Sequence, residues 1–312
     1  MSDSTRGVAA LLLACTVWGL SPLYYALLKH VPAAEVLAYR SLWSLVFFVL
    51  ILLAQGRLGL VRQAIAGRQV WLIGLAAVMI ASNWFGFIFA IQAGHGMEAS
   101  LGYYIFPLVA VILGWAIFDE RLGRAQWVAV ALAMLAVVGL TWGLGVPPWI
   151  ALALAVTFGA YGVAKKQLDL GPVVSVTAEV VLLAPIAIGW LVFAGTQIGA
   201  GTWQTHALLA LSGPLTASPL ILFSYAARRV RMATVGVVQY INPTLQFGCA
   251  VLVFGEVFTR WHGIAFPLIW LALAIYSVAA IRQDRASRRV LSSAVISGTV
   301  VTKDSTLSPA KP

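Results

Sequence analysis

The sequence predicts an all-α integral membrane protein with ten transmembrane helices. Of the 312 residues, 61% are hydrophobic and only 10% are charged, and the mean hydropathy is +0.94. Soluble domains are about 25% charged and 45–50% apolar, so this composition excludes them. The apolar runs are continuous and about 20 residues long, as in helices that cross a bilayer. Transmembrane β-strands would instead alternate apolar and polar residues.

The apolar runs follow one another with short connections, which leave no room for a domain outside the membrane. The first run follows the N-terminal MSDSTRG directly. It is longer than the hydrophobic region of a signal peptide, so we expect an uncleaved first span. The ten expected spans are residues 7–28, 35–55, 70–93, 98–118, 126–143, 147–164, 174–195, 207–227, 234–254 and 261–281.

The C-terminal segment differs from the rest of the chain. It contains the basic run RQDRASRR, followed by a stretch rich in Ser, Thr, Ala and Pro. Such a composition buries too little apolar surface to fold, so residues 284–312 are predicted to be a disordered basic tail. Its positive charge suits the anionic cytoplasmic leaflet of a membrane.

The positive charges are concentrated on one side of the expected topology. With the N-terminus inside, 17 of the 20 Lys and Arg residues fall on the inner side, whereas Lys29 and Arg260 fall outside and Arg40 lies within a span. Cytoplasmic loops of membrane proteins carry such an excess. Both termini are therefore expected in the cytoplasm. The net charge of +10 then reflects topology and calls for no nucleic-acid partner.

Two stretches of the chain repeat each other at a constant offset. Residues 104–120 read YIFPLVAVILGWAIFDE and residues 240–256 read YINPTLQFGCAVLVFGE, with proline and glutamate at matching places. We infer a duplication of about 140 residues, over 6–143 and 147–283. Because each copy has five spans, the second enters the membrane from the opposite side. Inverted repeats of this kind are typical of secondary transporters.

The short motifs of the chain resemble a known group. The matching stretches are Val17-Trp18-Gly19, Tyr39-Arg40-Ser41-Leu42-Trp43-Ser44, Asn83-Trp84, His95-Gly96-Met97-Glu98-Ala99-Ser100-Leu101-Gly102-Tyr103, Asp119-Glu120-Arg121-Leu122 and Gln239-Tyr240-Ile241-Asn242-Pro243-Thr244. From about residue 6 to 283 the chain resembles the EamA-type drug/metabolite transporter superfamily, and within it the RarD-type permeases of bacteria.

The resemblance implies ten helices in two inverted repeats around a central cavity, lined mainly by spans 1, 3, 4, 6, 8 and 9. It also implies movement of small metabolites or drugs across the bacterial inner membrane, and such proteins are commonly labelled chloramphenicol-sensitive permeases. One departure concerns the residue before the first-repeat proline. The family often has a polar residue there, whereas this chain has Phe106, and Asn242 keeps a polar group in the second repeat.

Two prolines and a set of polar and aromatic side chains are candidates for the transport site. Pro107 and Pro243 remove the helix donors of the carbonyls of residues 103 and 239. They are therefore candidate hinges, although they could equally be tolerated kinks. The candidates for lining a substrate cavity are Trp18, Asn83, Trp84, Tyr103, Tyr104, Gln239, Tyr240 and Asn242. The alternative is hydrogen bonding between helices for the Tyr, Gln239 and Asn242 side chains, and plain packing for Trp18, Asn83 and Trp84.

Charged residues within the spans are costly and need a reason. The candidates for a coupling or structural charge are Arg40, Glu98 and Glu179. Arg40 is expected to reach the interface or to form a structural ion pair, and Glu179 could carry a coupled proton or form such a pair. By position, the expected partners are Glu35 or Glu98 for Arg40 and Lys165 or Lys166 for Glu179.

These observations favour a secondary-active transporter of small molecules that works by alternating access in the lipid bilayer. No catalytic constellation, metal-ligand set or cofactor motif is present in the sequence, and the absence of a Walker A motif argues against direct ATP drive. Proton coupling is an open alternative. The competing hypotheses are a membrane-embedded enzyme, which would need convergent catalytic side chains within the spans, and a membrane sensor that uses the basic tail as its output.

Overall fold

The protein is a bundle of helices. The computed structural model describes residues 3–118, 123–145, 148–193, 202–227, 229 and 238–296. Within these ranges every regular element is a helix. They are α1 (Asp3–Leu27), α2 (Ala33–Ala54), α3 (Leu58–Ala66), α4 (Val70–Ala93), α5 (Gly96–Phe118), α6 (Arg124–Leu144), α7 (Trp149–Lys166), α8 (Pro172–Phe193), α9 (Trp203–Ala227), α11 (Ile241–Gly248), the π-helix η2 (Cys249–Val253) and α12 (Arg260–Ile296).

The helices agree with the predicted membrane class. In the described part of the chain, eight helices are long and apolar enough to cross a bilayer, namely α1, α2, α4, α5, α6, α8, α9 and α12. The 18-residue α7 ends in two lysines, and α11 with η2 forms a shorter apolar segment. Each of these ten segments overlaps a predicted span. The all-α membrane class is confirmed, and ten crossings remain a prediction.

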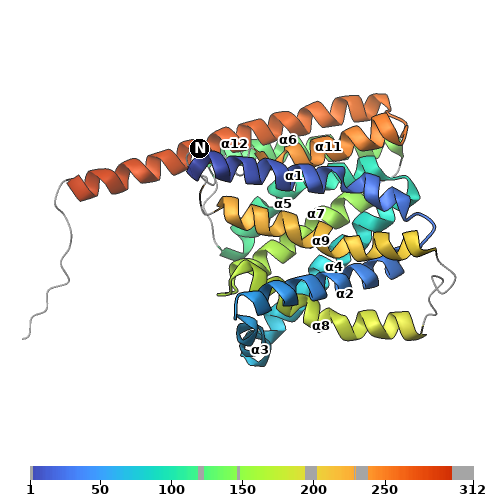
Figure 1. Cartoon of the computed structure of the whole chain (residues 1–312). Helices are drawn as coiled ribbons and strands as arrows, with labels where there is room; N and C mark the ends of the chain where they lie inside the picture. Colours follow the sequence, from blue (N-terminus) through green and yellow to red (C-terminus); the bar gives the residue numbers. More distant parts are fainter. Residues whose placement is uncertain are drawn as a thin grey trace, which may run out of the picture.

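One element, α3, was not predicted. It occupies the link between the second and third expected spans. Val61 and Ala64 are buried in a cluster with residues of α8, while Leu58 and Leu60 are exposed. Such a helix, apolar on one face and short, packs across the end of the bundle instead of spanning it (Figure 1).

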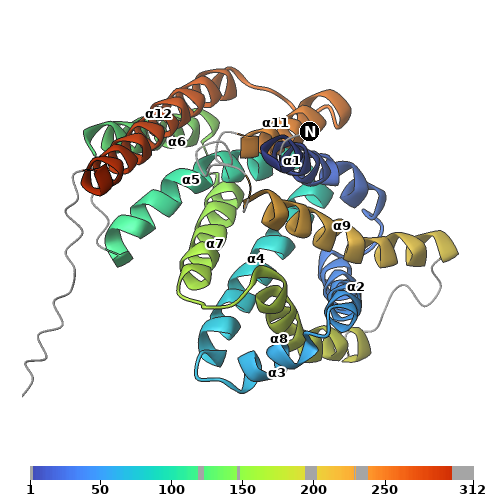
Figure 2. The same ribbon diagram turned by 60° about the vertical axis from the view of Figure 1, so that its left-hand side comes forward.

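The two halves of the chain interleave. Helix α1 packs on α9, α2 on α8 and α9, α4 on α7, α5 on α7, and α6 on α12. These partners all come from the other half of the sequence, whereas neighbouring helices of one half contact each other less. Figure 2 shows α6 and α12 together at the edge of the bundle and α4, α7 and α9 in its middle. The centre of the protein is therefore an interface between the halves.

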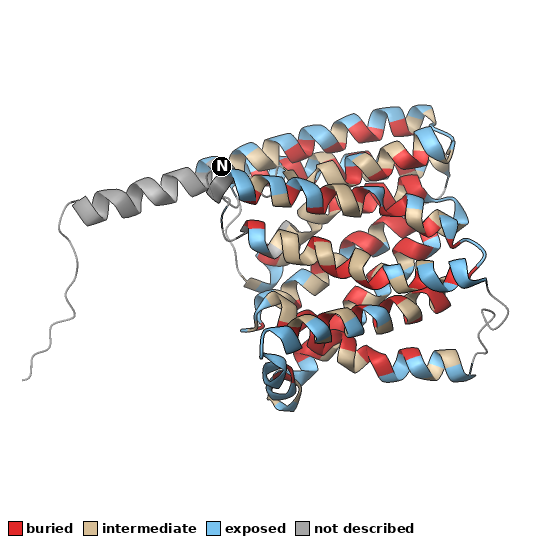
Figure 3. Cartoon of the chain, viewed as in Figure 1, coloured by how far each residue is buried: buried red, intermediate tan, exposed pale blue. Residues whose placement is uncertain are grey.

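The pattern of exposure suits a lipid environment. Many large apolar side chains are exposed. Exposed positions alternate with buried ones along the helices (Figure 3). Trp142, Phe193 and Leu252 are each more than 80% exposed. Apolar outer faces would aggregate in water but are stable against lipid tails, where helices associate by close packing and hydrogen bonds.

The N-terminus and the C-terminal part of α12 lie at the same end of the bundle (Figure 1). Arg57, Arg68 and Asp169 line one cavity at that end. At the other end, the Lys29 ammonium lies 5.5 Å from the centroid of the Phe254 ring. The helix α12 continues to Ile296 and projects beyond the bundle. The expected disordered tail is thus helical over 284–296, because α12 extends through the basic run, and residues 297–312 lie outside the described residues.

A close contact between α2 and α9 gives a prediction about stability. A Cβ added at Gly213 would lie 2.6 Å from the Trp43 carbonyl oxygen, so the two backbones fit together only without a side chain. We expect Gly213→Ala to destabilise the protein by about 1–3 kcal/mol through overpacking. Gly189 in α8 has open space around it and provides the matched control, Gly189→Ala.

The measurement is thermal unfolding of the detergent-solubilised protein. The readout is the fraction of protein that stays monodisperse at each temperature. Gly213→Ala should unfold at a clearly lower temperature than the wild type, and Gly189→Ala should not. Equal midpoints for the two variants would show that the backbones of α2 and α9 are not in close contact.

Candidate substrate site

A buried amide links three helices in the middle of the bundle. Asn83 of α4 is only 1% exposed. Its Nδ2 donates to the Leu154 carbonyl (2.9 Å) and to the Thr157 hydroxyl (3.2 Å) of α7. The Tyr103 hydroxyl of α5 donates to Asn83 Oδ1 (3.0 Å). Buried polar groups need such partners, and here the partners come from both halves of the chain.

A buried arginine lies beside this amide. Arg40 of α2 is 7% exposed, and its Nε donates to the Thr216 hydroxyl of α9 (3.0 Å). The guanidinium carbon lies 4.2 Å from the centroid of the Trp84 ring of α4 and 5.7 Å from that of Tyr25 of α1. A cation over an aromatic face is stabilised by the ring quadrupole. Three other helices, α1, α4 and α9, therefore contact the guanidinium.

The partner expected for Glu98 differs in the structure, whereas a pairing of Arg40 with Glu35 stays a prediction. Ion pairs among the described residues include His95–Glu98 (3.2 Å) and Lys165–Glu179 (2.6 Å). Glu98 instead pairs within the first turn of its own helix. The Arg40 side chain points into the bundle, where aromatic faces and a hydroxyl contact it. The spacing of charges in the sequence does not indicate these neutral partners.

Three of the cavity candidates lie around Arg40. Trp84 contacts its guanidinium, Tyr103 interacts with it electrostatically, and Asn83 accepts from the Tyr103 hydroxyl. An aromatic chain connects Tyr25 through Phe87 to Tyr103, with ring centroids 5.9 and 5.8 Å apart. We call Arg40, Asn83, Trp84 and Tyr103 the interior cluster.

The other candidates lie elsewhere. The Tyr104 hydroxyl pairs with that of Thr244 (2.6 Å), and its ring packs on Phe266 and Trp270 of α12. Tyr240 packs against the same apolar cluster. Trp18 stacks near Phe223 of α9 at 6.0 Å, Asn242 accepts a bond from Gln246 (3.0 Å), and Gln239 is half-buried.

The two candidate hinges differ in their surroundings. Pro107 lies inside the long helix α5 and is half-buried. Pro243 is buried in the short α11, and its carbonyl accepts a hydrogen bond from the Ser100 hydroxyl of α5 (3.0 Å). The π-helix η2 follows directly. Irregular turns of this kind are frequent at functional sites, and here they lie where α11 meets α5.

Glu256 forms a contact that the sequence did not predict. Its carboxylate accepts from the backbone N–H groups of Gly96 (2.6 Å) and Met97 (2.8 Å) at the start of α5. A helix N-terminus favours a negative charge. We call this contact the outer clasp, because it joins the segment after η2 to the start of α5 at the end opposite the N-terminus. Glu120, the repeat counterpart of Glu256, lies outside the described residues.

The outer clasp should respond to pH. Burial raises the pKa of the Glu256 carboxyl above its ordinary value near 4.5, and the two backbone hydrogen bonds act in the opposite direction. A raised pKa means that the clasped state binds the proton more tightly. The stability that the Glu256 carboxyl contributes is therefore complete below about pH 4.5 and is lost as the pH rises through the raised pKa.

We therefore expect the unfolding midpoint of the wild type to fall relative to that of Glu256→Gln as the pH is raised from 4 towards neutrality. The variant carries no titrating group at this position, and it shares all other titrating groups with the wild type. The difference between the two curves therefore reports on Glu256 alone. Parallel midpoint curves for the two proteins would contradict a raised pKa at Glu256.

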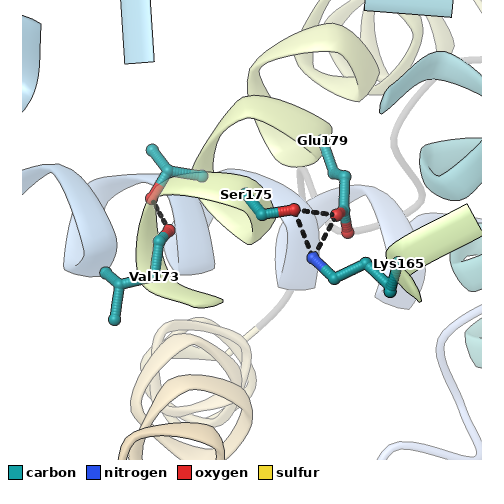
Figure 4. A network of polar contacts seen from close by, with 5 residues as sticks. Lys165, Val173, Ser175 and Glu179 are labelled. Atoms are coloured by element: carbon teal, nitrogen blue, oxygen red, sulfur yellow. Dashed lines mark hydrogen bonds and ion pairs between the residues drawn. The ribbon is translucent and has the colours of Figure 1, made fainter. Parts of the chain in front are cut away.

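A second buried charge network lies between α7 and α8 (Figure 4). Glu179 is fully buried, and its Oε1 lies 2.6 Å from Lys165 Nζ and accepts from the Ser175 hydroxyl (2.9 Å). Lys165 Nζ also donates to Ser175 Oγ. Of the two partners expected from the sequence, the structure thus pairs Glu179 with Lys165. Within the described ranges, no group of three or more His, Cys, Asp or Glu side chains could hold a metal ion.

A family comparison identifies the protein class. The model of the EamA-like transporter family matches residues 5–142 and again residues 147–278. The chain belongs to this family. The EamA chain is 44% identical to the protein RarD of Streptomyces exfoliatus, over 89% of this chain and 90% of that protein. It is 42% identical to an uncharacterized transporter of Pseudomonas aeruginosa, over 90% and 96% of the two chains.

The chain is similar to RarD proteins in sequence and to one solved structure in fold. The similarity to RarD proteins over most of the chain shows a RarD-type member of the superfamily and therefore a multi-pass membrane transporter. A crystal structure with 20% identity superposes with a TM-score of 0.61 over 90% of this chain and 99% of that one. At that identity the likeness concerns the fold alone.

Proposed function

We propose that this EamA chain is a secondary-active transporter of small metabolites or drugs that works by alternating access, with the interior cluster as its substrate site. The observation that carries the proposal is the position of this cluster. Asn83, which accepts from Tyr103 of the same half, donates to the Leu154 carbonyl of α7, and Arg40 donates to Thr216 of α9, so the polar centre lies between the halves. A site between two repeats is what a rocking mechanism requires.

The proposed topology has ten spans in two inverted repeats, with both termini in the cytoplasm of a bacterial inner membrane. Three observations support it. The family model matches each half separately. The ends of α1 and α12 lie on one side of the bundle. Most Lys and Arg residues also fall on that side in the predicted topology.

The outer clasp is the proposed closed gate on the outer side. It holds α5 of the first half to the segment after η2 in the second half through two charge-assisted bonds. Bonds to a charged group contribute about 1.5–3 kcal/mol each, a scale suited to a gate that must open. Pro107 and Pro243 are the proposed points at which these helices bend.

Glu179 is the proposed site of proton coupling. We expect Glu179→Gln to abolish uptake driven by a pH gradient, because an amide cannot bind and release a proton as a carboxylate can, and Lys165 would balance the negative charge of that carboxylate. Asp169→Asn, which neutralises an acid at the same end of the bundle, should leave uptake unchanged. The readout is substrate accumulation in proteoliposomes with and without a pH gradient.

Loss of the Glu179 charge alone leaves Lys165 buried without its partner, which can cost about 3–5 kcal/mol. The double variant Lys165→Met/Glu179→Gln removes both charges and separates misfolding from lost coupling. If Glu179→Gln accumulates substrate as the wild type does, Glu179 has no part in coupling.

The proposed function is tested by flux of a broad panel of small molecules through purified protein in proteoliposomes. We expect saturable movement of at least one compound class above that of empty vesicles. Deletion of residues 286–312 should leave this flux intact, whereas a sensor would lose its output. Absence of protein-dependent flux across the panel would contradict transport.

A further inference from the structure

The cavity at the N-terminal end of the bundle has no part in the proposed transport site. It has a volume of about 350 Å³ and lies between α3, the link from α3 to α4 and the start of α8. Binding sites for small ligands occupy about 300–1,000 Å³, so the cavity can hold a small polar group. It shares no residue with the interior cluster. Its polar lining consists of Arg57, Gln63, Arg68, Gln69 and Asp169.

The cavity carries an excess of positive charge. Among the described residues, its lining holds two arginines, Arg57 and Arg68, and one acid, Asp169. In the same part of the chain, neither guanidinium forms an ion pair or a side-chain hydrogen bond. Both arginines are exposed, so an anion can reach them from outside the bundle. Guanidinium groups bind phosphate through paired hydrogen bonds, and two of them line this one cavity.

Apolar side chains adjoin these cations. Leu60 lines the cavity with Arg57, and both Leu60 and Leu58 of α3 are more than a third exposed. Trp71, in the first turn of α4, is 65% exposed, and tryptophan is enriched where a membrane meets water. A short helix that carries both charged and apolar side chains suits the same interface. The cavity therefore lies at the level of the lipid headgroups, with apolar surface beside its arginines.

We propose that this cavity binds the phosphate of an anionic phospholipid of the cytoplasmic leaflet, with Arg57 and Arg68 as the phosphate ligands. A phospholipid presents a phosphate and apolar chains together, which matches two arginines beside Leu60. Basic pockets between helices on the cytoplasmic side of membrane proteins bind lipid headgroups. A free phosphate ion would use the arginines alone. The leaflet follows from the proposed topology, and the inference does not depend on transport.

The test is a titration of purified full-length protein in detergent with phosphatidylglycerol and, in parallel, with phosphatidylcholine of the same acyl chains. We expect a saturable rise of the unfolding midpoint with phosphatidylglycerol alone, because the choline cation is repelled by the arginines. Inorganic phosphate and glycerol 1-phosphate form separate arms, which distinguish a lipid from a free phosphate. Neither should raise the midpoint at concentrations at which phosphatidylglycerol saturates.

Single substitutions locate the site. Arg57→Gln and Arg68→Gln should each weaken phosphatidylglycerol binding roughly tenfold, because each removes a charged donor to the phosphate. Without lipid, both variants should unfold at the wild-type temperature, because these side chains are exposed. Arg62→Gln is the matched control. Arg62 is an exposed arginine of α3 outside the cavity lining, so its variant should bind as the wild type does.

Asp169→Asn gives a change in the opposite direction. It removes the negative charge of the lining, so it should bind phosphatidylglycerol about two- to fivefold more tightly than the wild type, on the scale of exposed charge pairs. Weaker binding by this variant would contradict a phosphate placed beside Asp169.

Equal stabilisation by phosphatidylcholine would overturn the inference, as would phosphatidylglycerol binding that Arg57→Gln and Arg68→Gln both retain. Equal weakening by Arg62→Gln would show attraction to the general positive charge of this end instead of a site. Saturation by inorganic phosphate at the same concentration would show a site for a soluble anion. Because the readout is binding, each result stands apart from the outcome of the flux experiments.

Discussion

Asn83→Leu is expected to reduce transport at least about 100-fold, the largest effect of any single substitution in the interior cluster. The change removes three hydrogen bonds at once and leaves the Tyr103 hydroxyl and the Leu154 carbonyl without this partner. Each buried group left unsatisfied costs about 1–3 kcal/mol, and about 1.4 kcal/mol corresponds to tenfold. The measurement is initial flux in proteoliposomes at equal amounts of folded protein.

Tyr103→Phe is the matched control for Asn83→Leu. It keeps the ring between Phe87 and Phe158 but removes the hydroxyl that donates to Asn83. We expect a decrease of roughly tenfold, because one hydrogen bond is lost in place of three. If Asn83→Leu transports as well as Tyr103→Phe, the amide does not organise the site.

A reversible cross-link across the outer clasp is expected to reduce transport to the level of empty vesicles. Met97 and Glu256 are changed to cysteine after Cys15 and Cys249, both free and buried, are changed to alanine. A short, reducible dithiol-specific cross-linker then joins α5 to the segment after η2. The reason for the loss is that the proposed outer gate can no longer open. Reduction should restore flux.

Each single-cysteine variant treated with the same reagent is the control for the cross-link. These variants should keep their own level of transport, because no covalent bond joins the two halves. Undiminished flux through fully cross-linked protein would show that the outer clasp does not move during transport.

The membrane class and the positions of the helices could be predicted from the sequence because both depend on local composition. A run of about 20 apolar residues has few alternatives in a bilayer. Helix α3 was missed because its nine residues carry too short a pattern to be separated from a link. The C-terminal end of α12 was missed because charged residues are compatible with both helix and disorder.

The site was predicted only in part, since helix periodicity and contacts between distant segments decide it. Tyr103 and Tyr104 are neighbours in sequence, but successive residues on a helix point about 100° apart. Tyr103 therefore reaches Asn83, whereas Tyr104 reaches Thr244 of α11 and packs on α12. The matching glutamates of the repeat only marked the ends of two spans, and the contact of Glu256 with Gly96 joins residues 160 positions apart.

Arg40 illustrates the same limit for charges. The sequence indicated that a cation within a span needs a partner, and the nearest acids at the same end were the natural candidates. Its observed neighbours, Trp84 and Thr216, come from two other helices. No pattern of charge spacing could have indicated them, because one is an aromatic ring and the other a neutral hydroxyl.

Access to Thr216 from both sides of the membrane tests alternating access most directly. Thr216→Cys is placed in the background without Cys15 and Cys249, and a membrane-impermeant thiol reagent is applied to right-side-out and inside-out vesicles. Thr216 binds Arg40 and is 7% exposed in the closed bundle. We predict slow modification from both sides, and faster modification from the outer side when the outer clasp is removed by Glu256→Ala. Modification from one side only, under both conditions, would contradict a site that opens alternately to each side.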